Sequence, residues 1–154
     1  PHPLPPVGPD FPDAQIDAVI RLVKDIATRW KIRPERILAH SDIAPGRKID
    51  PGEGFPWEKL AAAGIGLWPE KISPPSIAMP SYRSGPSYCL GDEGMPVAAL
   101  QAMFAKFGYG IEITGVFDQR TFDVVVAFQR HWRQDKVDGV ADGGTMAALR
   151  ALLR

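Results

Sequence analysis

The stretch HSDIAPGRKIDPG, from His40 to Gly52, decides the fold of the first half of this chain. Its prolines and glycines are turn formers, and they predict a long ordered loop rather than a regular helix or strand. A neutral imidazole and a carboxylate are both acceptable zinc ligands, which His40 and Asp50 supply. Lys48 can stabilise the oxyanion that forms when metal-activated water attacks a carbonyl. The stretch is therefore a candidate zinc site with two visible ligands, and it needs a third.

These residue types leave a purely structural interpretation open. A histidine and an aspartate ten residues apart do not form a recognised metal-binding spacing, and a lone histidine is more often structural. Asp42 and Asp50 can equally be turn residues that hydrogen-bond to their own backbone, with Lys48 as a solvated surface charge. The spacing alone does not choose between the two interpretations.

The segments that flank this loop have the patterns of regular elements. Residues 37–39 are a short apolar run that predicts a buried strand ending at His40. Residues 55–63 predict a short helix, with Pro56 in its first turn and Gly64 as its stop signal. Residues 13–30 predict an amphipathic helix, because apolar side chains recur at helical spacing: Ile16, Val19, Ile20, Val23, Ile26, Ala27 and Trp30.

A stretch rich in proline, serine and glycine divides the chain. It extends from Ser73 to Ser87 and is typical of an interdomain linker. We therefore expect a first domain over residues 1–72, a linker over 73–86 and a second domain over 87–154.

The second domain contains an internal repeat with an offset of 24 residues. TGVFDQRT, which starts at Thr114, aligns with DGVADGGT, which starts at Asp138. In each copy a glycine permits a tight turn and an aspartate can cap the following helix: Gly115 and Asp118, then Gly139 and Asp142. A further apolar pattern over residues 96–107 predicts an earlier helix, so we expect three short helices around one core.

Taken whole, the quoted stretch and the Phe-Pro-Trp that follows it resemble the zinc-site segment of the type 2 family of N-acetylmuramoyl-L-alanine amidases. In that family the histidine and the aspartate of this segment ligate zinc, and the lysine assists catalysis. These roles carry over to His40, Asp50 and Lys48. The resemblance implies an α/β fold, a mixed sheet with helices, for residues 1–72.

The second domain resembles the small all-α peptidoglycan-binding domain that is often attached to such enzymes. Tyr109 and Trp132 are candidates for contact with sugar or peptide, but sequence does not separate them from core residues. Substrate-binding residues therefore stay unassigned. The features that carry the resemblance occur in the family's order: Leu100-Gln101, Phe107-Gly108-Tyr109, Gly115-Val116-Phe117-Asp118, Thr121, Phe128-Gln129 and Asp138-Gly139.

Two residues that the amidase family requires have no counterpart here. They are an early zinc histidine and a glutamate that acts as general base. His2 lies in a proline-rich stretch expected to be a linker, and His131 lies in the second domain. The glutamates are not at the base position either: Glu35, Glu53 and Glu58. We therefore expect the chain to begin inside the catalytic domain, with an associated N-terminal fragment of the same protein as a candidate partner.

The composition is that of an ordinary globular protein. Of 154 residues, 45% are hydrophobic and 23% are charged. Its 18 basic and 18 acidic side chains balance, so no net charge attracts nucleic acid. No apolar run reaches the roughly 18 residues that a membrane-spanning helix needs. Cys89, the one cysteine of the sequence, excludes an internal disulfide and is expected to be a small buried apolar residue.

The leading hypothesis is zinc-dependent hydrolysis of the amide between N-acetylmuramic acid and L-alanine in peptidoglycan or muropeptides. This substrate implies the cell envelope, either the periplasm with or without an outer-membrane anchor, or secretion. The alternative is a non-catalytic peptidoglycan-binding fragment or targeting protein whose incomplete zinc site is vestigial. A cytoplasmic amidase that recycles muropeptides is disfavoured, because a wall-binding module has little use there.

Overall fold

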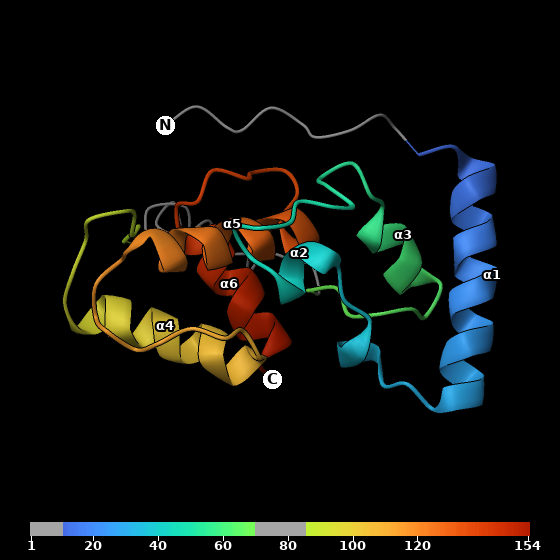
Figure 1. The fold of residues 1–154 in the computed structure, drawn as a ribbon, viewed down its shortest axis with the longest axis horizontal. Helices are drawn as coiled ribbons and strands as arrows, with labels where there is room; N and C mark the ends of the chain where they lie inside the picture. The colour runs from blue at the N-terminus through green and yellow to red at the C-terminus, as the bar shows by residue number, and fades with distance from the viewer. Residues whose placement is uncertain (1–10, 70–85) are drawn as a thin grey trace, which may run out of the picture.

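The computed structural model describes residues 11–69 and 86–154, and regular structure in these ranges is helical. Figure 1 shows α1 and α3 at one end of the molecule, α4, α5 and α6 at the other, and α2 between them. The helices are α1 (Asp13–Trp30), the 3-10 helix η1 (Pro34–Arg36), α2 (His40–Ile43), α3 (Trp57–Ala62), α4 (Met95–Phe107), α5 (Gln119–Trp132) and α6 (Gly143–Leu152).

The predicted first helix is confirmed as α1. It begins after Pro12, with Asp13 at the positive end of the helix dipole, and it ends where Lys31 takes a left-handed conformation with φ of 52°. Its apolar stripe packs against α3 and the residues that follow it. The small core formed in this way contains five buried side chains: Ile16, Ala39, Trp57, Leu60 and Ile65.

The predicted α/β fold with a mixed sheet is wrong for the described residues, which contain no strand. Residues 37–39 are extended, with Ile37 at φ −94° and ψ 100°, but no described segment pairs with them. A strand needs a neighbour to receive its backbone hydrogen bonds, and an apolar run alone does not supply one. His40 accordingly starts α2 instead of ending a strand.

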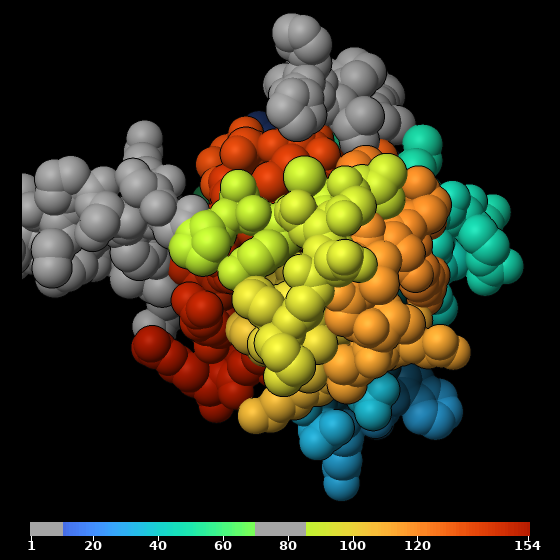
Figure 2. Space-filling view, turned by 90° about the vertical axis from the view of Figure 1, so that its left-hand side faces the viewer, coloured from blue at the N-terminus to red at the C-terminus, as the bar shows by residue number. Residues whose placement is uncertain are grey.

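The helices predicted for the second half are present as α4, α5 and α6. In Figure 2 the segment that contains α4 (yellow) faces the viewer, with α5 (orange) on one side and α6 (red) on the other. Two isolated antiparallel bridges, from Tyr88 to Ala141 and from Glu93 to Val116, fasten the segment before α4 to the two turns of the repeat. The core that the three helices enclose contains mainly these buried side chains: Val97, Leu100, Phe104, Phe117, Val124, Val125, Phe128, Trp132 and Leu149.

Both capping aspartates of the repeat behave as expected. Asp118 accepts a hydrogen bond from the backbone N–H of Thr121, and Asp142 accepts one from that of Thr145. These hydrogen bonds hold the pKa of Asp118 below its usual value, mainly through the backbone N–H of Thr121. Burial raises the pKa of Asp142, but hydrogen bonds from Arg133, Lys136 and Thr145 outweigh burial and lower it.

Each turn of the repeat is also filled by a buried glutamine, which the sequence analysis named only as part of the family resemblance. The amide of Gln101 donates to the carbonyl of Val116 at 2.9 Å and accepts from the N–H of Gly115 at 2.8 Å. Gln129 does the same in the second copy, donating to the carbonyl of Val140 at 3.0 Å and accepting from the N–H of Gly139 at 2.8 Å. These bonds pair the backbone N–H of each glycine, and they add to the hydrogen bond that each valine carbonyl already accepts from the N–H of Asp118 or Asp142.

The prediction that Cys89 is buried is wrong. Its side chain is exposed, in the turn before α4, where its backbone N–H donates to Asp92 at 2.8 Å. No helix within the two described ranges has the length and apolar character needed to cross a membrane. The proposed linker over residues 73–86 lies almost entirely outside the described residues, and so does His2.

Candidate metal loop and its contact with the second domain

The quoted stretch folds as one helical turn followed by a loop that returns to its own start. Residues 40–43 form α2, and the N–H of Lys48 donates to the carbonyl of Ala44 at 3.0 Å. The carbonyl of Asp50 then accepts a hydrogen bond from the N–H of Ser41 at 3.1 Å. The two ends of the loop are therefore held together by backbone bonds.

This closure brings the two predicted metal ligands together. His40 Nδ1 lies 3.2 Å from Asp50 Oδ2, and the two side chains are 52% and 62% exposed. Two ligands that are each about 2.0–2.1 Å from one tetrahedral zinc ion lie about 3.3 Å apart. The two atoms are within hydrogen-bond distance of each other, and the nitrogen and oxygen donors also have the type and the separation that one zinc ion could bridge.

The rest of a metal site is not found in the described part of the chain. Within residues 11–69 and 86–154, no group of three or more histidine, cysteine, aspartate or glutamate side chains could hold a metal ion. Lys48, two residues before Asp50, is exposed and makes no ion pair with a described residue.

Asp42, on the same helical turn as His40, is buried and joins the two halves of the chain. It reaches back to the start of α2, where it accepts from the N–H of Ala39 at 2.7 Å. Its other bonds come from the second half. Tyr109 donates its hydroxyl to Asp42 Oδ1 at 2.9 Å, and His131 Nδ1 lies 2.6 Å from Asp42 Oδ2. Sequence reasoning treated Asp42 only as a turn residue.

The ionisation of this cluster follows from its burial. Burial raises the pKa of Tyr109 well above its usual value, and the neighbouring Asp42 carboxylate adds to this effect. Burial lowers the pKa of His131, although Asp42 acts in the opposite direction. A neutral His131 donates from Nδ1 to Asp42, which leaves its buried Nε2 without a described partner.

Aromatic rings surround this contact. The His131 ring stacks on Trp57 of the first half, with centroids 3.7 Å apart, and on Trp132 at the same distance. The indole N–H of Trp132 donates to the carbonyl of Leu67 at 3.2 Å. Tyr109 and Trp132 are therefore buried residues of the contact between the halves, with exposed fractions of 7% and 4%.

A second set of bonds holds the end of the loop. Arg130 pairs with Glu53 at 3.2 Å, and the two side chains are only 11% and 8% exposed. Gln134 donates its amide to the carbonyls of Glu53 and Phe55, both at 2.7 Å. Arg120 donates to the carbonyl of Pro45 at 3.3 Å. The candidate metal loop is thus fastened to α5 at Asp42 and Pro45, and the residues just after the loop are held by Arg130 and Gln134.

Comparison with known proteins finds a matching family model for each part of the chain. Residues 5–53 match the family model described as N-acetylmuramoyl-L-alanine amidase. Over these residues, the chain is similar to that amidase family. Residues 93–149 match the model described as "Putative peptidoglycan binding domain". We refer to the described residues 11–69 as the amidase segment and to residues 86–154 as the peptidoglycan-binding domain.

AmiD and AmpDh3, two proteins similar to this chain, are about twice as long as it. The N-acetylmuramoyl-L-alanine amidase AmiD of Escherichia coli is 39% identical over 143 residues, which are 93% of this chain and 49% of AmiD. The structure of AmiD with the substrate anhydro-N-acetylmuramic acid-L-Ala-D-gamma-Glu-L-Lys aligns with a TM-score of 0.75 over 94% of this chain and 52% of that one. AmpDh3 of Pseudomonas aeruginosa aligns with a TM-score of 0.76 at 36% identity, covering 94% of this chain and 54% of its own. The chain therefore spans about half the length of AmiD and of AmpDh3.

Proposed function

We propose that this chain supplies two zinc ligands and the wall-binding module of an N-acetylmuramoyl-L-alanine amidase. The observation that carries the proposal is the 3.2 Å approach of His40 Nδ1 to Asp50 Oδ2, on a loop that lies within the amidase-family match. The substrate is the amide between N-acetylmuramic acid and L-alanine. The substrate found in the AmiD complex and the identity to AmiD support this assignment.

Four residues of the loop have roles in this proposal: His40, Ser41, Lys48 and Asp50. His40 and Asp50 hold the metal, which, when bound, supplies a Lewis acid that lowers the pKa of water toward about 7. Lys48 extends from the same loop and places its ammonium near the negative charge that develops on the carbonyl oxygen. The hydrogen bond from the backbone N–H of Ser41 to the carbonyl of Asp50 keeps the two ligands close together.

The peptidoglycan-binding domain gives the enzyme its attachment to the wall. We retain the division into residues 1–72, 73–86 and 87–154 as part of the proposal. Because the substrate is polymeric and lies in the cell envelope, we place the protein there. An associated N-terminal part of the same protein is the proposed source of the third ligand and the general base.

One observation favours a second function, that of a non-catalytic wall-binding protein. The described residues hold two metal donors and no group of three. A two-donor site binds zinc weakly compared with the three protein ligands of catalytic sites.

Digestion of purified sacculi distinguishes the two functions. The protein, together with the proposed N-terminal part, is incubated with sacculi in the presence of chelator and then after zinc is restored. Newly freed L-alanine amino groups are measured in each condition. We expect release that stops with chelator, returns with zinc and is lost in Asp50→Ala. Asp135→Ala, which removes an exposed carboxylate outside the loop, is the matched control and is expected to keep activity. Binding to sacculi without release in any condition supports the non-catalytic function.

A further inference from the structure

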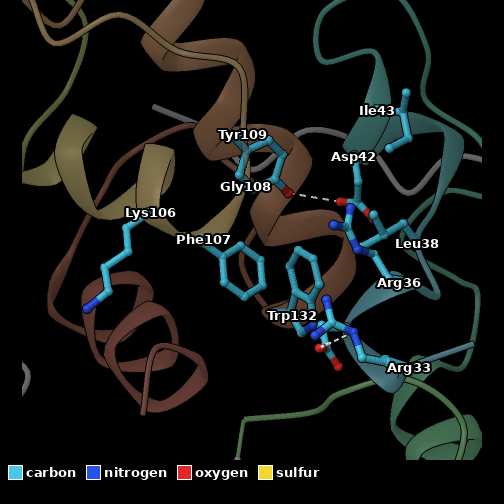
Figure 3. Close-up of a pocket in the computed structure, with 11 residues that line it drawn as sticks. Arg33, Arg36, Leu38, Asp42, Ile43, Lys106, Phe107, Gly108, Tyr109 and Trp132 are labelled. Atoms are coloured by element: carbon cyan, nitrogen blue, oxygen red, sulfur yellow. Dashed lines mark hydrogen bonds and ion pairs between the residues drawn. The ribbon is translucent and has the colours of Figure 1, made fainter.

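A pocket of about 380 Å³ opens between the amidase segment and the peptidoglycan-binding domain. Figure 3 shows Arg33 and Arg36 on one side, Lys106 on the other, and the rings of Phe107 and Trp132 between them. This volume lies in the range of sites that bind small organic ligands, about 300–1,000 Å³. Both parts of the chain line the pocket, so it exists only because the two are docked.

The pocket adjoins the candidate metal loop. Ile43 lines the pocket and is 68% exposed. It lies three residues after His40 in the single turn of α2, and side chains at this spacing are neighbours on one helix face, about 5–6 Å apart at Cβ. A substrate whose scissile amide lies at the loop can therefore place the part of the molecule beyond that amide in the pocket.

The charged side chains of the pocket determine which charge its ligand should have. Arg33 pairs with Glu35 at 3.1 Å, and the Asp42 carboxylate, which keeps its negative charge, is buried and accepts hydrogen bonds from Tyr109 and His131. Arg36 and Lys106 make no ion pair with a described residue and are both exposed. Two cations are thus available to an anionic ligand.

The aromatic rings give the pocket an apolar base. Phe107 and Trp132 meet edge to face, with centroids 4.9 Å apart and planes at 87°. This surface suits the alkyl part of an amino-acid side chain, while the cations at the margin suit carboxylates.

We propose that this pocket binds the free carboxylates of the peptidoglycan stem peptide. The identity of the ligand rests on the proposed function, in which the substrate joins a neutral saccharide to a peptide. In a stem that contains L-Ala, γ-linked D-Glu and L-Lys, free carboxylates occur at the D-Glu α-carbon and at the C-terminus. The peptide, and not the sugar, therefore matches Arg36 and Lys106.

The test is calorimetric titration of the whole chain in the presence of chelator, so that binding is measured apart from zinc chemistry. The ligands are the tripeptide L-Ala-D-γ-Glu-L-Lys, the same tripeptide with both carboxylates amidated, and an N-acetylglucosamine–N-acetylmuramic acid disaccharide whose lactyl carboxyl is amidated, so that it is neutral. Arg36→Glu/Lys106→Glu reverses both pocket cations. Lys24→Glu/Arg154→Glu makes the same charge change at exposed positions outside the pocket and is the control.

We expect the tripeptide to bind the unaltered chain and the control alike, and the pocket variant at least roughly tenfold more weakly, because reversal replaces attraction with repulsion. Amidation of the tripeptide should weaken binding similarly. Circular dichroism checks that the exposed substitutions leave the fold intact. Equal binding by the two variants, equal binding of the amidated tripeptide, tighter binding of the disaccharide or no tripeptide binding at all overturns the proposal. Zinc-dependent release from sacculi is scored separately, so either proposal can fail while the other stands.

Discussion

Truncation of Asp42 is the most direct perturbation of the contact between the two halves. Asp42→Ala removes the acceptor of three hydrogen bonds, from the N–H of Ala39, the hydroxyl of Tyr109 and Nδ1 of His131, at 2.7, 2.9 and 2.6 Å. An unsatisfied buried donor costs about 1–3 kcal/mol. Tyr109 and His131 are both buried, so their two lost bonds alone predict a loss of about 2–6 kcal/mol in the free energy of unfolding. Domains of this size have only about 5–15 kcal/mol in total.

Urea unfolding monitored by tryptophan fluorescence measures this loss, because Trp57 and Trp132 both stack on His131. Asp42→Asn retains one carbonyl oxygen for the Tyr109 hydroxyl and is expected to lose clearly less than Asp42→Ala. Asp25→Ala, which removes an exposed partner of Arg29, is the control and should change stability by less than about 1 kcal/mol. A loss below about 1 kcal/mol for Asp42→Ala would refute the argument that the buried carboxylate joins the halves.

Three further predictions test other parts of the structure. In urea unfolding, Gly139→Ala should destabilise the protein by about 1–3 kcal/mol more than Gly64→Ala. Both glycines have a positive φ, but a Cβ at Gly139 would lie 2.1 Å from the Phe122 ring, whereas a Cβ at Gly64 would have no atom within 4 Å. Equal losses would contradict the packing argument. The pKa values of Asp118 and Asp142 are lowered in the folded protein, so the stability that these residues contribute is complete above their unfolded pKa of about 3.9 and is lost as pH falls through their folded values. The free energy of unfolding should therefore fall less between pH 5 and pH 2 in Asp118→Asn/Asp142→Asn than in the unaltered protein. An equal fall in the two proteins would count against the capping role. Zinc titration followed by NMR should shift the exposed imidazole of His40 and leave the buried ring of His131 unchanged, and Asp50→Ala should reduce the shift of His40; a shift confined to His131 would exclude the proposed ligands.

Local patterns predicted local structure well. The apolar stripe of residues 13–30 gave α1, and the repeated Gly-Val-x-Asp turn gave the capping aspartates of α5 and α6. These features depend on residues within one or two helical turns of each other. The predicted roles of His40, Lys48 and Asp50 as ligands and catalyst remain predictions.

Contacts between distant residues were not predictable. Asp42 is separated by 67 residues from Tyr109 and by 89 from His131, and a single sequence carries no record of such pairs. The strand expected at residues 37–39 failed for the same reason, because its partner must come from another segment. Gln101 and Gln129 were visible in the motif, but polar residues are usually placed at the surface, and only the folded turns make them buried hydrogen-bonding centres.

The hydrogen bonds and the ion pair that join the peptidoglycan-binding domain to residues 42–55 determine how much of the cell wall the proposed enzyme can reach from one binding position. A binding module on a flexible tether lets the catalytic centre sample a volume set by the length of the tether. Here Arg130, Gln134 and His131 fasten the module directly to residues 42–55, which removes that freedom. In the proposed enzyme, the position at which the module binds the sacculus would therefore determine which amide bonds lie within reach, and the enzyme would have to dissociate and rebind to hydrolyse amides elsewhere.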